Sequence, residues 1–160
     1  MTHGIGLLLP EEARARRDEL IALCAQAFGA APWHEPPLGA VRTADRLVDS
    51  AARRTDFHAV AALDEDGALR GLAAGWTDTV LSGDAPAFEL AELVVAPAHQ
   101  GRGLGRALHD ALLTGAPGPA LLMTLDVPEL TDRYARWGWT VVDRRRPDRE
   151  ERDYVVMGRP

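Results

Sequence analysis

The chain has 160 residues, of which 46% are apolar, a length and composition typical of one globular domain. Its formal net charge of −6 argues against a broad nucleic-acid-binding face, which would show an excess of basic residues. All 18 of its basic residues are arginines, which excludes a lysine Schiff base and a P-loop lysine.

Cys24 is the only cysteine, so the sequence excludes an internal disulfide and a cysteine-based metal site, and we expect Cys24 to pack inertly. No segment approaches the ~18 apolar residues of a membrane span. The N-terminal residues lack the basic region of a signal peptide. These features predict a cytoplasmic protein with no membrane partner and no nucleic-acid partner.

The hydrophobic periodicity predicts a β-α-α-β-β-β-α-β-α-β-β order, which is typical of an α+β fold with a mixed sheet. Glycines and prolines mark the boundaries between the expected elements. These are strand 5–9, helix 11–28, loop 29–39, helix 40–54, strands 57–63 and 68–80, loop 82–86, strand 87–96, helix 105–115, strand 119–127, helix 128–138, and strands 139–145 and 152–158.

Residues 94–113, V-V-A-P-A-H-Q-G-R-G-L-G-R-A-L-H-D-A-L-L, join an apolar run to a helical pattern through glycines and arginines. Such a loop offers unpartnered main-chain N–H groups at the positive end of a helix dipole, which favours a bound phosphate. The same glycines are also compatible with a tight turn that binds nothing. The candidate phosphate-binding residues are Gly101, Gly103 and Gly105, with Arg102 and Arg106 on the rim.

Other phosphate signatures fit this stretch poorly. The dinucleotide fingerprint G-x-G-x-x-G fails because Arg106 stands where the third glycine is needed. A methyltransferase-like site is a weaker alternative, with Asp126 about twenty residues downstream as a ribose ligand. The six residues from Ala96 to Gly101 make a long strand-to-glycine turn, and 34 residues after Asp126 are too few for a doubly wound sheet.

Residues 93–108 resemble the acyl-CoA-binding motif of the GNAT superfamily of N-acetyltransferases. Gln100, Gly103 and Gly105 occupy its defining positions. A second motif, Y-A-R-W-G-W at 134–139, is similar to the late Y-x-x-x-G-F of that family, with Trp139 in the phenylalanine position. The resemblance implies one domain over 1–160, with a mixed, mostly antiparallel sheet of six to seven strands flanked by about four helices.

The sequence departs from the family pattern near the start of helix 128–138. Val127 and Leu130 stand where many members carry asparagine and alanine. The resemblance therefore leaves the contact between that helix and the pantetheine arm undefined.

The resemblance also implies acetyl-CoA as co-substrate and no metal. The pyrophosphate would lie on the amides of the glycine loop, and the pantetheine arm would lie beside strand 87–96 like an added strand. An N–H of Val94 or Val95 would hold the oxyanion. The cofactor-binding residues implied are Leu93, Val94, Val95, Gln100, Gly101, Arg102, Gly103, Leu104, Gly105 and Arg106.

For catalysis, the resemblance implies Glu89 or Glu92 as general base and Tyr134 as the general acid that protonates the departing thiolate. The two glutamates are three residues apart, so a regular strand would point them to opposite faces unless it contains a bulge. We favour Glu89, because it shares its parity with Leu93 and Val95.

The acceptor is expected to be the amine of a small molecule or peptide. Trp33, Glu35 and Asp78 lie in the segments that form the acceptor mouth in this family, and they suit a cationic group. The histidines show no metal-ligand spacing. A homodimer is compatible with the family. The alternative from another class is a non-catalytic acyl-CoA-binding sensor.

Overall fold

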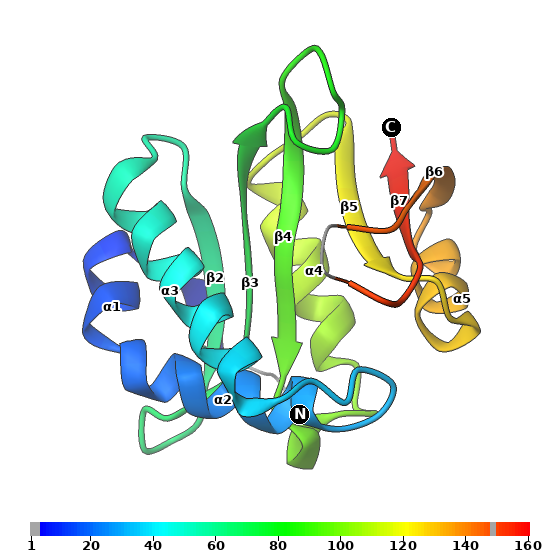
Figure 1. Ribbon diagram of the computed structural model, residues 1–160. Coiled ribbons are helices and arrows are strands. Elements are labelled where there is room, and N and C mark those ends of the chain that lie inside the picture. Colours follow the sequence, from blue (N-terminus) through cyan, green and yellow to red (C-terminus); the bar gives the residue numbers. More distant parts are fainter. Residues whose placement is uncertain (1–3, 148–149) are drawn as a thin grey trace.

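A seven-stranded sheet in the order β1-β2-β3-β4-β5-β7-β6 organises the computed structural model, which describes residues 4–147 and 150–160 (Figure 1). Each neighbouring pair is antiparallel except β4 and β5, so the expected mixed, mostly antiparallel α+β sheet is confirmed. The strands are β1 (Ile5–Leu7), β2 (His58–Leu63), β3 (Leu69–Asp78), β4 (Ala87–Val95), β5 (Ala120–Leu125), β6 (Thr140–Arg145) and β7 (Tyr154–Arg159).

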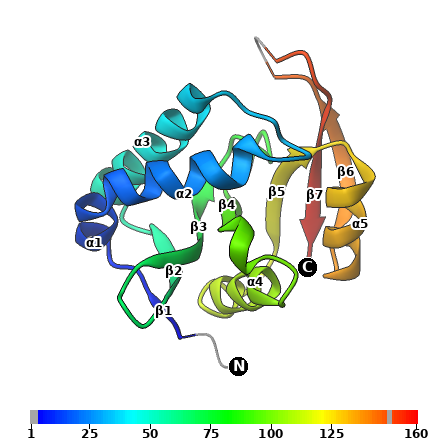
Figure 2. The ribbon, with the colours of Figure 1, turned by 90° about the horizontal axis from the view of Figure 1, so that it is seen from below.

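Helices cover both faces of the sheet, and each face buries its own apolar cluster. The α-helices of the described residues are α1 (Pro10–Ala15), α2 (Arg17–Gly29), α3 (Pro37–Arg53), α4 (Leu104–Thr114) and α5 (Pro128–Arg136). Figure 2 shows α1, α2 and α3 on one side of the sheet and α4 on the other. The cluster under α2 and α3 includes Leu47 and Trp76, and the one under α4 includes Leu108 and Trp139. No helix of residues 4–147 and 150–160 is both long and apolar enough to cross a membrane.

The helix expected over 11–28 is interrupted at Arg16. This residue ends α1 and precedes α2, with φ −98° and ψ 19°, and its side chain bonds to Glu19 and to the carbonyl oxygen of Gly67. The next helix begins at Pro37, before the expected position 40. Proline suits a first helical turn because its φ is fixed and it needs no N–H acceptor there.

A bulge in β4 determines where its two glutamates point. Glu89 pairs with Trp76 and Glu92 pairs with Ala74, so two β4 residues between the glutamates face one β3 residue, Gly75. The extra residue puts Glu89 and Glu92 on the same face of the sheet. The parity argument that grouped Glu89 with Leu93 and Val95 was therefore wrong, because the alternation of the strand shifts at the bulge.

The parallel strands β4 and β5 are joined over two residue pairs, Phe88 with Ala120 and Glu89 with Leu121. Figure 1 shows the two strands side by side where they begin and diverging toward their C-terminal ends. The second half of β4 therefore has an edge inside the sheet that no neighbouring strand covers.

Candidate active site

The glycine loop leads from β4 to the start of α4. A short 3-10 turn, Pro97–His99, follows β4, and Gly103 is the N-cap of α4. Gly101 has φ 76° and Gly103 has φ 82°, a left-handed conformation that side chains with a Cβ rarely adopt. The first main-chain bond of the helix joins Ala107 N to Gly103 O, so the preceding amides of the first turn have no helical acceptor. These amides are therefore available to an anion.

Two side chains of this segment have intramolecular partners. Gln100 Nε2 donates to the carbonyl oxygen of Val95 at 2.9 Å and holds the loop against the end of β4. The Arg106 guanidinium bonds to Asp110 at 3.1 Å and lies 5.6 Å from the ring centroid of Trp137. Arg106 is therefore anchored along α4, whereas Arg102 is exposed on the loop.

The hydrogen-bond pattern of β3 and β4 decides which main-chain groups face the opening between β4 and β5. Ala96 N donates to Arg70 O at 2.8 Å, so Val94, two residues earlier, also directs its N–H and C=O toward β3. By the same alternation, Leu93 and Val95 direct theirs toward the opening. The bond from Gln100 to Val95 O agrees with this assignment.

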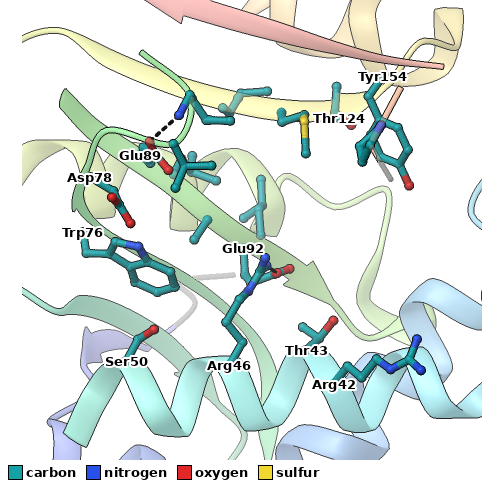
Figure 3. Close-up of a pocket in the computed structure, with 18 of the residues that line it drawn as sticks. Arg42, Thr43, Arg46, Ser50, Trp76, Asp78, Glu89, Glu92, Thr124 and Tyr154 are labelled. Atoms are coloured by element: carbon teal, nitrogen blue, oxygen red, sulfur yellow. Dashed lines mark hydrogen bonds and ion pairs between the residues drawn. The ribbon is translucent and has the colours of Figure 1, made fainter. Parts of the chain in front are cut away.

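A cavity of about 590 Å³ lies on the α3 side of β4, beside this opening (Figure 3). It is lined by α3, the end of β3, the middle of β4, β5, Tyr134 of α5 and the start of β7. The expected residues Glu89, Glu92, Tyr134, Trp33, Glu35 and Asp78 all contribute to its lining. The structure thus brings the candidate catalytic residues and the candidate acceptor-binding residues to one cavity.

Glu89 is buried on the cavity wall, with 7% of its surface exposed. Its Oε2 accepts a 2.9 Å hydrogen bond from the main-chain N–H of Leu81, drawn as a dashed line in Figure 3. Burial is the main cause that raises the pKa of Glu89 above the ordinary value of a glutamate, and the Leu81 bond opposes it. A carboxylate with a raised pKa is a stronger base than an exposed one.

Glu92 is also buried, but it is paired. Arg46 of α3 reaches across the cavity to its Oε1, as Figure 3 shows. Burial raises the pKa of Glu92, and the charge and the hydrogen bond of Arg46 lower it. Because this oxygen binds a guanidinium, Glu92 is less available to a substrate proton than Glu89.

Tyr134 is buried on α5, where its ring meets the rings of Trp137 and Trp139 edge-on at 5.5 and 6.3 Å. No hydrogen bond joins its hydroxyl to any residue in the described ranges 4–147 and 150–160. Burial raises the pKa of Tyr134 to about 12, so the phenol keeps its proton at physiological pH.

The candidate acceptor-binding residues differ in how far other residues already bind their side chains. Asp78 binds Arg54 at 2.8 Å, so its charge is largely balanced. The Trp33 ring packs edge-on against Phe28 at 5.3 Å, while its carbonyl oxygen accepts a bond from Arg152. Burial raises the pKa of Glu35, which bears the less compensated carboxylate of this group.

The sequence reasoning did not identify Arg46. It lies on the cavity side of α3 with Thr43 and Ser50, three and four residues away, as Figure 3 shows. The helical spacing of these three polar residues was the available signal. In the described part of the chain no three histidine, cysteine, aspartate or glutamate side chains are grouped to hold a metal ion.

The sequence and the fold were compared with known proteins. The model of the acetyltransferase (GNAT) family matches residues 18–136. A search of the curated proteins finds no sequence that matches the chain. Three similar solved structures follow, and at these identities they establish similarity of fold alone.

Histone acetyltransferase HPA2 and related acetyltransferase from Corynebacterium glutamicum is 17% identical with a TM-score of 0.73, and the match covers 100% of this chain and 97% of that one. NAA60 of Arabidopsis thaliana, solved with a bisubstrate analogue, is 15% identical with a TM-score of 0.69, over 98% and 97% of the two chains. The PaiA N-acetyltransferase of Thermoplasma acidophilum, solved with coenzyme A, is 16% identical with a TM-score of 0.68, over 99% of both.

Proposed function

Because the chain belongs to the acetyltransferase (GNAT) family, we propose that it moves an acetyl group from acetyl-CoA to the amine of a small molecule or peptide. The transfer is direct, by attack of the amine on the thioester within a ternary complex. One observation carries the proposal: the glycine loop, the uncovered edge of β4 and two buried glutamates converge where β4 and β5 separate.

The glycine loop and β4 bind different parts of acetyl-CoA. The amides that begin α4, with Arg102 beside them, hold the pyrophosphate. The outward main-chain groups of Leu93 and Val95 pair with the pantetheine arm, which lies in the opening like an extra strand. Of the two N–H groups expected to hold the oxyanion, that of Val94 points toward β3, so the Val95 N–H stabilises the oxyanion that forms as the amine attacks.

Glu89 acts as the base. An alkylamine with a pKa near 10.4 is neutral in only about one molecule in two thousand at neutral pH, so a proton must be removed before attack. The free oxygen of Glu89 takes this proton, directly or through a water molecule, while the other oxygen stays bound to Leu81 N–H. Its buried position raises the pKa of the carboxyl group, which favours this role.

Tyr134 completes the reaction. As the tetrahedral intermediate collapses, the bond between carbon and sulfur breaks and the thiolate leaves. The Tyr134 hydroxyl donates its proton to that sulfur, the former amine nitrogen loses its remaining excess proton to water, and the phenolate regains a proton from water, which gives free CoA and the amide. A phenol that stays protonated at neutral pH and has no intramolecular partner in the described residues suits this step.

Direct transfer agrees with the state of the single thiol. A two-step route through an acyl-cysteine would need a reachable thiolate. Cys24 is fully buried, and burial raises its pKa to about 12. It therefore remains a thiol in the core, as its sequence context predicted.

The acceptor class follows from the charges of the cavity. The arginines Arg46, Arg53 and Arg54 are each paired with a carboxylate, Glu92, Asp49 and Asp78 respectively. Among the described residues, the buried Glu89 and the half-buried Glu35 remain as carboxylates without a guanidinium bond. Such a lining suits a primary amine that enters as a cation and gives up one proton at Glu89.

The test is a screen of acetyl-CoA turnover that measures free thiol over several classes of amine, together with calorimetry of CoA binding. Turnover with at least one amine, lost in E89Q while CoA still binds, supports the enzyme. Tight CoA binding with no turnover over the whole panel identifies an acyl-CoA sensor instead. No CoA binding at all contradicts both.

A further inference from the structure

Arg145, near the end of β6, binds the loop between β3 and β4 through two main-chain carbonyls. Its Nη1 donates to Val80 O and its Nη2 to Leu81 O, each at 2.9 Å. The remaining nitrogen, Nε, donates to Asp143 at 3.2 Å. A planar guanidinium thus fixes the direction of two successive carbonyls, a geometry that a single ammonium group cannot reproduce.

The same peptide segment carries the hydrogen bond to Glu89. Leu81 accepts from Arg145 through its carbonyl oxygen and donates to Glu89 Oε2 through its N–H. One residue therefore connects the guanidinium on β6 to the carboxylate on β4. The contact spans 64 residues of sequence and joins the last residue of β6 to the loop that precedes β4.

The charges around Glu89 come from three elements. Asp78, at the end of β3, raises the pKa of Glu89, while Arg54, after α3, and Arg145 lower it. Arg54 and Asp78 bind each other at 2.8 Å, so their effects on Glu89 largely cancel. Arg145, which is bound to residues 80 and 81, is therefore the remaining positive charge that lowers the pKa of Glu89.

We infer that Arg145 is a positioning residue for the transfer: it holds Leu81 so that the Leu81 N–H orients Glu89 toward the acceptor amine. This inference rests on the proposed function of Glu89 as the base. It assigns a role to the β6 strand, which among the described residues contributes no side chain to the cavity lining and acts through Leu81 instead.

Three variants test it. R145Q removes both the charge and the two-carbonyl contact, and R145K keeps the charge but not the contact. R144Q is the matched control, because Arg144 is the neighbouring arginine on the same strand and binds Asp126 at 2.6 Å, outside the cavity. Each variant is measured for kcat and KM, for the pH profile of kcat/KM, for CoA affinity and for thermal stability.

R145Q is expected to lower kcat about tenfold or more, since misplacement of a reacting group is costly, while CoA affinity stays unchanged. Its acidic limb moves to higher pH because the positive charge near Glu89 is lost. R145K is expected to lower kcat and to move the acidic limb less than R145Q does, because it disturbs the Leu81 contact but keeps the charge, and R144Q is expected to match the parent. A parent-like kcat and pH profile in R145Q, or an equal loss in R144Q, overturns the inference.

An NMR titration separates this inference from the proposed function, because it needs no turnover. The Leu81 amide proton is bonded to Glu89, so its chemical shift follows the ionisation of that carboxyl group. R145Q is expected to move the midpoint to higher pH, and R144Q to leave it in place. If the parent acetylates no amine but this shift is seen, the positioning role stands and the proposed function falls. An unchanged Leu81 titration in R145Q overturns the positioning role whatever the turnover.

Discussion

The indole Nε1–H of Trp139 donates a 2.9 Å hydrogen bond to Nε2 of His109, inside the cluster that α4 buries against the sheet. Nε2 therefore carries no proton, and Nδ1–H of the neutral imidazole donates to Asp110 at 2.8 Å. Burial lowers the pKa of His109 below 6.5, more than the adjacent Asp110 raises it. The tryptophan that replaces the phenylalanine of the Y-x-x-x-G-F motif is thus fixed through an uncharged histidine.

His109 makes stability depend on pH in a defined direction. As the pH falls below about 6.5, the unfolded chain binds a proton at this histidine while the folded chain does not, so the free energy of unfolding falls until the lower folded pKa is reached. The slope from this group is at most about 1.4 kcal/mol per pH unit. Urea unfolding at several pH values measures it. H109Q is expected to lose this part of the slope and H99Q to keep it. An unchanged slope in H109Q would refute the assignment.

Glu89 and Glu92 are expected to respond differently to the same substitution. E89Q should lower kcat by about 10²–10⁴ because it removes the base, while the amide oxygen still accepts from Leu81. E92Q should cost less than about tenfold, because Glu92 is bound to Arg46. Steady-state kinetics of the two purified variants decides this, and a larger loss in E92Q would exchange their roles.

The pH dependence of the reaction should also report Glu89. The base must be ionised, so kcat/KM rises with pH through the pKa of Glu89, which burial places above the ordinary value of 4.5. Profiles of the parent and of E92Q are expected to share this acidic limb. An acidic limb at or below the ordinary value would contradict a buried base.

Tyr134→Phe tests the proton donor. Loss of the hydroxyl is expected to lower kcat about a hundredfold and to leave CoA affinity near that of the parent, because the donor acts on the leaving sulfur. The phenol has a pKa of about 12, so it should produce no basic limb in the usual assay range. Single-turnover kinetics with calorimetry checks both points, and a parent-like rate of acetyl transfer in the variant would remove Tyr134 from the mechanism.

Gly103→Ala, compared with Gly67→Ala, separates backbone strain from ligand binding. Both glycines have φ 82°, and an added Cβ meets no atom within 4 Å at either position, so each variant should lose about 1–2 kcal/mol of stability. Gly103 caps α4 in the glycine loop, whereas Gly67 lies in the turn between β2 and β3. Calorimetry is expected to show weaker CoA binding for Gly103→Ala alone. Equal CoA affinity in the two variants would show that the glycine loop does not bind the co-substrate.

The order of the helices and strands was predictable, because the spacing of the apolar residues differs between a helix and a strand and stays constant along most elements. The glycine loop was predictable too, since left-handed residues at 101 and 103 need a residue without a Cβ. The sequence left a bulge between Glu89 and Glu92 as an alternative but did not establish it, because one extra residue leaves no trace in composition and reverses the alternation beyond it. The contacts of Arg46 and Arg145 could not be predicted either. Each joins residues that are more than 40 positions apart in the sequence and that only the folded sheet brings together.

Because β4 and β5 are joined by only two residue pairs, the sheet consists of two parts that meet at one corner. One part contains β1 to β4, and the other contains β5, β7 and β6. A molecule that pairs with the free half of β4, as we propose for the pantetheine arm, would lie between the two parts of the sheet and add main-chain hydrogen bonds to the apolar cluster that already joins them.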